Sequence, residues 1–392
     1  MNLARRITQI KPSATLTINT KAQELRAAGR QIVSLAVGEP DFRTPEHVCE
    51  AARKAMEDGF TRYTPVPGIP ELRTAVAGYF KKFYGVDAAL ENVVVTNGGK
   101  QSLYNLFQVL LDPGDEVIIP APYWVSYPAL VQLADGVSVF VKTEPENNFL
   151  ASVEQLEAVR TPKTKCLVLN TPSNPTGCHY SRAQLDAIAA WAVEKGIFVV
   201  ADEIYDRLVY GDTEAVSLSP WWQKYPENFA VINGLAKSFA MTGWRVGYTL
   251  AHPDLIKAMT KIQGQSTSNI CSIAQKAALA ALSGSWDCLD EMKKAFVRRR
   301  DMGLSMVLGW GKVICPKPDG AFYLFPQVDA YYTATVPDST ALCAHLLENA
   351  GVALVPGAAF GNDRCIRISY ALDDETLKTC LEKIGTALHA LK

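Results

Sequence analysis

The chain has 392 residues, of which 48% are hydrophobic and 20% are charged, a balance that excludes a coiled coil, a collagen-like chain and a disordered chain. Its 39 basic and 40 acidic side chains give a formal net charge of −1, so no basic excess indicates binding to nucleic acid or to an anionic membrane. No apolar stretch approaches the ~18 residues that a membrane-spanning helix needs.

The N-terminal segment is basic. It carries Arg5, Arg6, Lys11 and Lys21, with no acidic side chain before Glu24. It has no apolar core, so we do not expect a secretory signal. An organelle transit peptide and an arm that docks on a partner subunit both fit this pattern, and the small number of serines favours the arm.

The nine cysteines are an odd number without any C-x-x-C spacing, and the five histidines form no pair of metal ligands. We therefore expect neither a metal site nor a disulfide framework. Free, mostly buried thiols suit a reducing compartment, which predicts a cytoplasmic protein.

Short apolar segments alternate with helical segments over residues 45–285. A helix is predicted over residues 102–111, and another begins at Ser181, where Gln184 completes a capping box. Strands are predicted over residues 93–96, 116–120, 166–170, 197–201, 230–232 and 246–250. Continuous apolar strands between helices favour an α/β fold with a mostly parallel sheet that is covered on both faces.

The C-terminal part has a different pattern. Residues 318–328 are predicted to form two strands that turn at Asp319 and Gly320, and residues 365–370 a further strand between two helices. We expect a smaller α+β domain that the N-terminal segment joins. The predicted division is an arm and start of the small domain over residues 1–44, a large domain over 45–290 and a small C-terminal domain over 291–392.

Polar or glycine-rich segments follow five of the predicted strands. They cover residues 96–102, 122–124, 170–177, 202–205 and 234–248. Each has an ordinary structural explanation by itself: a tight turn, a core aromatic, a rigid loop, a helix cap or a solvated lysine. Ligands of parallel α/β sheets bind beyond the carboxyl ends of the strands, so we expect these segments to meet at one edge.

Together the five segments supply the groups that one cofactor would use. Two glycines before a helix can hold a phosphate, and the other segments bring an aromatic ring, an amide, a carboxylate with a phenol, and a lysine. A phosphorylated aromatic aldehyde that binds lysine would use all of them, and that cofactor is pyridoxal 5′-phosphate (PLP).

With these motifs the sequence resembles the fold-type I, class I aminotransferases, most closely the bacterial aspartate aminotransferases of subgroup Ib. The resemblance runs from Lys11 to Tyr370 and is most specific over residues 173–177 and 236–247. It implies a large, mostly parallel-sheet domain with PLP, a smaller α+β domain, and a homodimer with shared active sites.

The resemblance also implies roles around the cofactor ring. Lys237 would bind PLP covalently and then shuttle a proton, and Asp202 would pair with the pyridine nitrogen and keep it protonated. Tyr205 and Asn174 would donate hydrogen bonds to the 3′ oxygen of the ring. Trp124 would stack on the ring, and Trp124 and Asn174 would also contact the substrate.

At the phosphate end, the resemblance implies contacts from Arg245 and from the turn formed by Gly98, Gly99 and Lys100. Tyr63 would reach the phosphate in the neighbouring subunit's site, which predicts an obligate dimer.

For the substrate, the resemblance implies that Arg367 grips the α-carboxylate and that the backbone of Gly38 contacts the same group. Lys100, with Ser13 and Thr15 on the N-terminal arm, would bind a distal carboxylate. The other interpretation of Lys100 is a solvated lysine beside the phosphate.

Two positions depart from relatives. Many relatives place a serine three residues before the lysine, where this chain has Gly234, so one phosphate contact is either missing or supplied elsewhere. In the other large aspartate aminotransferase subgroup an arginine of the partner binds the distal carboxylate, and residues 263–275 here contain none.

These implications favour amino transfer between aspartate or glutamate and a 2-oxo acid such as 2-oxoglutarate or oxaloacetate. Transfer to prephenate and an aromatic aminotransferase stay open as alternatives, as does a PLP-dependent β-lyase. A PLP-sensing transcription regulator would need an appended DNA-binding domain, for which the aminotransferase pattern leaves no residues.

Overall fold

The computed structural model describes residues 1, 3–4, 7–8, 10 and 14–391. Its centre is a seven-stranded sheet with the order β2-β8-β7-β6-β5-β3-β4, in which only β8 runs antiparallel to its neighbours. The strands are β2 (Val93–Thr96), β3 (Glu116–Ala121), β4 (Val137–Lys142), β5 (Thr164–Asn170), β6 (Phe198–Asp202), β7 (Phe229–Gly234) and β8 (Gly247–Leu250). The predicted α/β fold with a mostly parallel sheet is confirmed.

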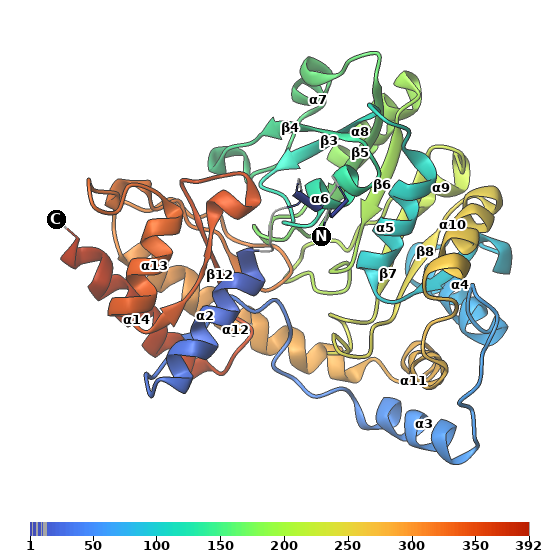
Figure 1. Cartoon of the computed structure of the whole chain (residues 1–392), viewed down its shortest axis with the longest axis horizontal. Helices are drawn as coiled ribbons and strands as arrows, with labels where there is room; N and C mark the ends of the chain where they lie inside the picture. The colour runs from blue at the N-terminus through green and yellow to red at the C-terminus, as the bar shows by residue number, and fades with distance from the viewer. Residues whose placement is uncertain (2, 5–6, 9, 11–13, 392) are drawn as a thin grey trace.

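Helices cover both faces of this sheet (Figure 1). One face packs against α5 (Gly99–Leu110), α6 (Tyr127–Leu133) and α10 (Pro253–Ser266). The other packs against α4 (Pro70–Tyr84), α7 (Val153–Val159), α8 (Arg182–Lys195), α9 (Ser219–Lys224) and α11 (Ser272–Ser283), with α3 (Glu46–Glu57) on α11. Because successive strand residues point to opposite faces, the apolar side chains of β2, β3, β5, β6 and β7 divide between two separate cores.

The C-terminal part is built on two small sheets. The first has the order β11-β12-β9, and the second pairs β1 with β10. Their strands are β1 (Val33–Ser34), β9 (Tyr323–Leu324), β10 (Val352–Ala353), β11 (Val355–Pro356) and β12 (Ile366–Ser369). The parallel pairing of β1 with β10 places the N-terminal segment in this part of the molecule.

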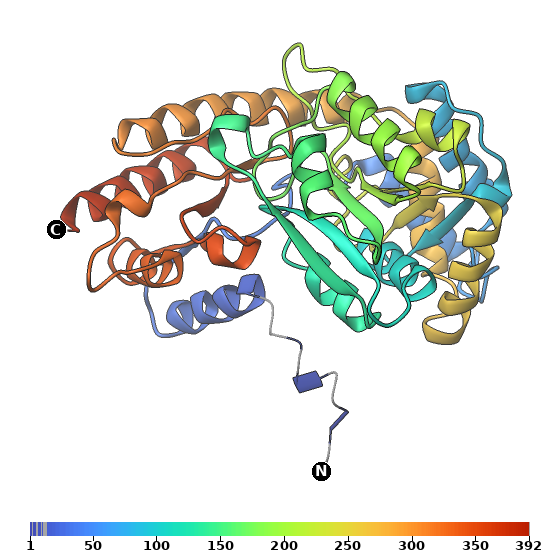
Figure 2. The same ribbon diagram turned by 90° about the horizontal axis from the view of Figure 1, so that it is seen from above.

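Four α-helices surround these small sheets, namely α2 (Ala14–Ala27), α12 (Asp287–Gly309), α13 (Ser339–Asn349) and α14 (Asp374–Ala390). The long helix α12 extends from α11, beside the large sheet, to α14 in the C-terminal part (Figures 1 and 2). The described residues also form short 3₁₀ helices at Leu90–Asn92, Pro145–Asn147, Asp329–Tyr331 and Gly357–Phe360.

Local sequence signals place several of these elements correctly. Ser181 caps α8 by accepting a hydrogen bond from the amide of Gln184, whose side chain accepts one from the amide of Ser181, as the capping box predicts. Gly196 ends the same helix with a left-handed φ of 66°. The edge strand β4 was not predicted, and all but one of its residues are exposed or only partly buried.

The predicted strand pair over residues 318–328 is wrong. Only β9 forms there, and it pairs with β12 instead of folding back on itself. The amides of Asp319 and Gly320 both donate to the carbonyl of Gly177, so this segment packs on the loop after β5. That long-range contact replaces the local turn. Within the described part of the chain, no helix combines the length and apolar character needed to cross a membrane.

Candidate active site

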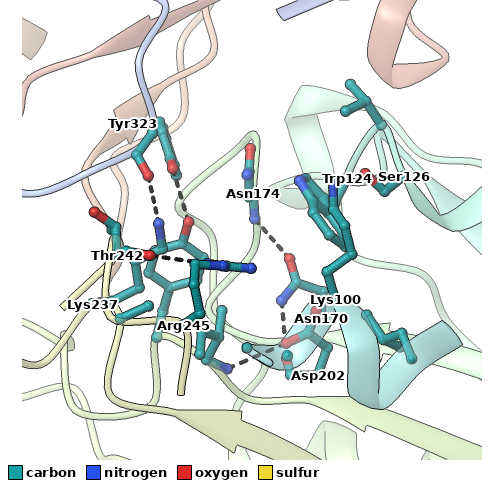
Figure 3. Close-up of a pocket in the computed structure, with 18 of the residues that line it drawn as sticks. Lys100, Trp124, Ser126, Asn170, Asn174, Asp202, Lys237, Thr242, Arg245 and Tyr323 are labelled. Carbon is teal, nitrogen blue, oxygen red and sulfur yellow. Dashed lines mark hydrogen bonds between the residues drawn. The ribbon is translucent and has the colours of Figure 1, made fainter. Parts of the chain in front are cut away.

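The carboxyl ends of the parallel strands face the C-terminal part across a cavity of about 350 Å³. Eleven of the residues singled out in the sequence line it. They are Gly38, Gly98, Gly99, Lys100, Trp124, Asn174, Asp202, Tyr205, Lys237, Arg245 and Arg367. Figure 3 shows Lys237, Arg245 and Thr242 on one side and Trp124 on the other, with Asn174 between them. Segments more than 300 residues apart in sequence therefore meet at one site, as expected from the strand ends.

Lys237 follows β7 and points its ammonium group into the cavity, where it donates a hydrogen bond to the carbonyl of Gly38. Desolvation is the main reason why its pKa falls to about 8 from the ordinary value for lysine, and the positive charges of Arg367 and Arg245 lower the pKa further. The carboxylate of Glu39 opposes this shift. The neutral amine of Lys237 is therefore far more populated near neutral pH than that of an ordinary lysine.

Asp202 is the last residue of β6 and is almost fully buried. Its Oδ2 accepts a hydrogen bond of 2.6 Å from the hydroxyl of Tyr127. Burial raises the pKa of Asp202 to about 6, while the bond from Tyr127, the backbone amide of Ile204 and the charge of Lys237 counteract this rise. The site can therefore hold a buried negative charge that is available to a cationic partner.

The loop after β5 is fixed by Asn170. Its side-chain oxygen accepts from the backbone amide of Asn174 at 2.8 Å, and its side-chain nitrogen donates to the carbonyl of Asp202 at 2.9 Å. The loop is thereby tied to the next strand (Figure 3). Asn174 Oδ1 in turn accepts a hydrogen bond from Arg367.

Arg367 lies on β12 and is buried. One terminal nitrogen donates to Asn174 Oδ1 at 2.9 Å and the other to the carbonyl of Ala36 at 2.6 Å, while its Nε has no hydrogen-bond partner. Among the described residues, no carboxylate forms an ion pair with Arg367. A buried guanidinium of this kind suits the carboxylate of a ligand.

Two cations lie near the N-terminus of α5. Gly98 adopts a φ of 79° immediately before the helix, and a Cβ there would lie 2.7 Å from a terminal nitrogen of Arg245. Arg245 donates to the carbonyls of Thr242 and Asn97, at 2.9 and 3.2 Å. The Nζ of Lys100 lies 5.1 Å from the ring centroid of Trp124. The pKa of Lys100 is lowered, chiefly because the side chain is partly buried and secondly because of the positive charge of Arg245. A helix N-terminus with two cations favours an anion.

Known proteins are similar to this chain in sequence and in architecture. The family model for aminotransferase class I and II matches residues 30–384. An aspartate aminotransferase from Streptomyces avermitilis is 46% identical over all of this chain and 97% of its own length. The chain belongs to the class I and II aminotransferases.

An aspartate/prephenate aminotransferase from Thermus thermophilus is also 46% identical, over 98% of each chain. The solved structure of aspartate aminotransferase from Thermus thermophilus with maleate matches with a TM-score of 0.94 and 45% identity, over 99% of this chain and 100% of that chain.

This aminotransferase is therefore a transaminase with the fold-type I architecture. The family, the fold and the reaction class predicted from the sequence are confirmed. The roles of individual site residues and the domain boundaries stay predictions.

Gly234 of the aminotransferase does not line the cavity, because β7 and β8 approach each other closely at this point. A Cβ at Gly234 would lie 2.8 Å from the carbonyl oxygen of Val246 and 3.0 Å from the Cα of Gly247. A Cβ at Gly247 would in turn lie 2.4 Å from the backbone of Gly98. A serine at position 234 would therefore be crowded by the backbone beneath the anion-binding turn.

Of the other predicted site residues, Ser13 lies outside the described residues, and the structure does not describe the side chain of Thr15. Tyr63 does not line the cavity. Tyr63 is 91% exposed on the segment between α3 and α4. Two buried glutamines hold that segment: Gln263 donates to the carbonyl of Val66, and Gln275 donates to the hydroxyl of Thr64.

Sequence reasoning missed several residues of the aminotransferase cavity. They include Leu103, Val125, Ser126, Asn170, Ile204, Ala236, Thr242 and Tyr323. Tyr127, which bonds Asp202, was missed as well. Asn170 and Thr242 lie within motifs that the sequence had marked, so those motifs contained a signal for them. Tyr323 had no such signal in the sequence, because it lies in a segment that was predicted to form a simple strand pair.

Proposed function

We propose that this aminotransferase uses PLP to transfer an amino group between aspartate or glutamate and a 2-oxo acid such as 2-oxoglutarate or oxaloacetate. The observation that carries the proposal is the arrangement of Lys237 and Asp202 on one cavity with the cationic turn around Gly98. The relatives named aspartate aminotransferase support the choice of substrates.

The donor set fits PLP. The N-terminus of α5 and Arg245 would hold the phosphate, Trp124 would stack on the ring, and Asp202 would pair with its nitrogen. Tyr205 and Asn174 would hold the 3′ oxygen. When bound, PLP supplies an aldehyde that reacts with amines and a ring that withdraws electrons from the substrate Cα.

Lys237 would carry the covalent attachment and then move the proton at the substrate Cα. A pKa of about 8 suits both tasks, since a general base acts best when its pKa is near the working pH. The carbonyl of Gly38, which accepts a hydrogen bond from Lys237, orients the amine. Asp202 would keep the ring nitrogen protonated because its buried charge favours a cation there.

Two cations would recognise the substrate. Arg367 would bind the α-carboxylate, and its unpartnered Nε supports an incoming anion. Lys100 would bind the distal carboxylate of aspartate or glutamate from beside Trp124. Prephenate, which also has two carboxylates, is a second candidate acceptor, supported by the Thermus thermophilus relative named aspartate/prephenate aminotransferase.

We also propose a cytoplasmic homodimer in which Tyr63 completes the partner's phosphate site. An aromatic side chain that is 91% exposed, on a segment held by buried glutamines, supports an interface at this point.

A panel of amino donors and 2-oxo acceptors, prephenate included, tests the substrate assignment with PLP-loaded enzyme. We expect aspartate or glutamate to be the best donor. The cofactor should carry the amino group after the first half-reaction, when the donor has left as a 2-oxo acid, and should return to the aldehyde once the acceptor has taken that group. Elimination products, or equal activity with alanine and phenylalanine, would contradict the proposal.

A further inference from the structure

Tyr323 is a fully buried residue on the wall of the cavity, and neither the cofactor contacts nor the substrate contacts proposed above involve it. Its hydroxyl lies 2.8 Å from the hydroxyl of Tyr205, and either phenol can donate across this contact. Its ring centroid lies 4.6 Å from the Cζ of Arg367. One side chain thus contacts two residues that are predicted to serve different ligands.

The register of the small sheet explains the contact with the guanidinium. Strands β9 and β12 are antiparallel, and Tyr323 lies opposite Ser369. Arg367, two residues before Ser369, therefore points to the same face as Tyr323. Phe360 lies on the same guanidinium, with a ring centroid 5.1 Å from its Cζ. Aromatic faces stabilise a buried guanidinium that has no carboxylate partner.

The backbone leaves room for the Tyr323 hydroxyl. A Cβ at Gly38 would lie 2.7 Å from the hydroxyl oxygen, so any side chain at that position would displace it. The carbonyl of the same Gly38 accepts the hydrogen bond from Lys237. The hydroxyl therefore has a fixed place between the N-terminal segment and the turn after β6.

We propose that Tyr323 is a positioning residue with two separable roles. Its ring holds Arg367 in the orientation that binds the α-carboxylate, and its hydroxyl donates to Tyr205 while Tyr205 donates to the 3′ oxygen of the cofactor. A hydroxyl that accepts one hydrogen bond becomes a stronger donor in the next. This inference rests on the proposed function.

Tyr323→Phe tests the hydroxyl because it keeps the ring. The measurement is the pH titration of the bound PLP absorbance in the purified holoenzyme. Losing the hydrogen bond from Tyr323 to Tyr205 should raise the apparent pKa of the bound PLP by about 0.3 to 1 unit. The reason is that the deprotonated form of the cofactor, with its negative 3′ oxygen, is then less stabilised. In a Tyr205→Phe background the same change should have no further effect, because the two groups act in series.

Tyr323→Leu tests the ring. We expect the KM for aspartate and for alanine to rise by about three- to thirtyfold, since both carry the α-carboxylate, whereas Tyr323→Phe should keep KM within about twofold. Phe360→Leu is the matched control. It removes the other ring on Arg367 but no contact with Tyr205, so it should raise KM without moving the absorbance titration.

The outcomes separate this inference from the function on which it rests. A wild-type enzyme that binds no PLP at Lys237 would overturn the proposed function. If PLP binds and the titration of Tyr323→Phe matches wild type, the role of the hydroxyl is wrong. If Tyr323→Phe raises KM as much as Tyr323→Leu, the role of the ring is wrong. If the Leu variant fails to fold, Tyr323→Phe still tests the hydroxyl, because that variant keeps the ring.

Discussion

The hydroxyl of Tyr127 donates a 2.6 Å hydrogen bond to Oδ2 of Asp202, and both side chains are buried. Tyr127 begins α6, and Asp202 ends β6, so two elements of the large domain meet at this bond. The rings of Trp124 and Tyr127 pack in a T-shaped arrangement, with centroids 5.3 Å apart. The carboxylate that would hold the cofactor nitrogen is therefore itself held by a phenol.

Removal of this bond by Tyr127→Phe should raise the pKa of Asp202 above its present value of about 6, because the hydrogen bond stabilises the charged form. A hydrogen bond to a charged group is worth about 1.5–3 kcal/mol, which corresponds to roughly one to two pKa units. Asp202 would then be partly protonated at pH 7. We expect weaker PLP binding and lower kcat near pH 6.5 and recovery toward pH 9, measured as PLP dissociation and kcat against pH. A defect of equal size at all pH values would contradict this explanation.

The attachment of PLP to Lys237 should follow the lowered pKa of the amine. With a pKa of about 8, roughly one amine in ten is neutral at pH 7, against fewer than one in a thousand for an ordinary lysine. The rate at which PLP attaches to the apoenzyme should therefore rise with pH and level off above about 8. Glu39→Gln removes a charge that raises the pKa of Lys237, so this variant should shift the midpoint downward. A midpoint near 10 would show that burial does not control this amine.

The role of Lys100 can be determined by comparing the substrates whose kcat/KM falls when its charge is removed. In Lys100→Met the stem remains beside Trp124 while the charge is lost. If Lys100 binds the distal carboxylate, kcat/KM for aspartate should fall by about ten- to a hundredfold, and kcat/KM for phenylalanine should change little. The measurement is the ratio of the two values at saturating PLP. A common decrease for both substrates, with weaker PLP binding, would assign Lys100 to the phosphate instead.

Gly234→Ser tests whether backbone packing fixes this glycine. The added side chain would collide with the carbonyl of Val246 and the backbone of Gly247, so we expect a loss of about 1–3 kcal/mol in the free energy of unfolding. Urea denaturation would measure it. Ala236→Ser is the control, since Ala236 lines the cavity and its side chain can extend into open space. A stable Gly234→Ser protein with tighter PLP binding would show that this position can reach the phosphate.

Tyr63 should act in the active site of the partner subunit. Mixing Tyr63→Ala with Lys237→Ala would form hybrid dimers in which one site carries both changes and the other carries neither. Activity should then rise above the mean of the two parents as subunits exchange. Mixing Lys237→Ala with wild type controls for exchange alone. No gain after exchange has been confirmed by mass spectrometry of tagged subunits would place Tyr63 in its own subunit's site.

Much of the site could be predicted because parallel strands end at a common edge. Lys237, Asp202 and Asn174 each follow an apolar strand that the sequence marks clearly, and the topology then brings them together. Gly98, which directly precedes α5, also carries a local signal, since its positive φ favours a residue without a Cβ.

By itself the sequence determined the features that depend on a few neighbouring residues. The capping box of Ser181, the apolar strands and the motif around Lys237 are such features, because local backbone preferences and hydrophobic patterns act over one or two turns. Only the tertiary structure decided the contacts between distant residues. Tyr205 and Tyr323 are 118 positions apart, and their contact depends on the packing of the small sheet against the turn after β6. The predicted strand pair at Asp319 failed for the same reason, since hydrogen bonds to Gly177 satisfied its backbone better than a local turn.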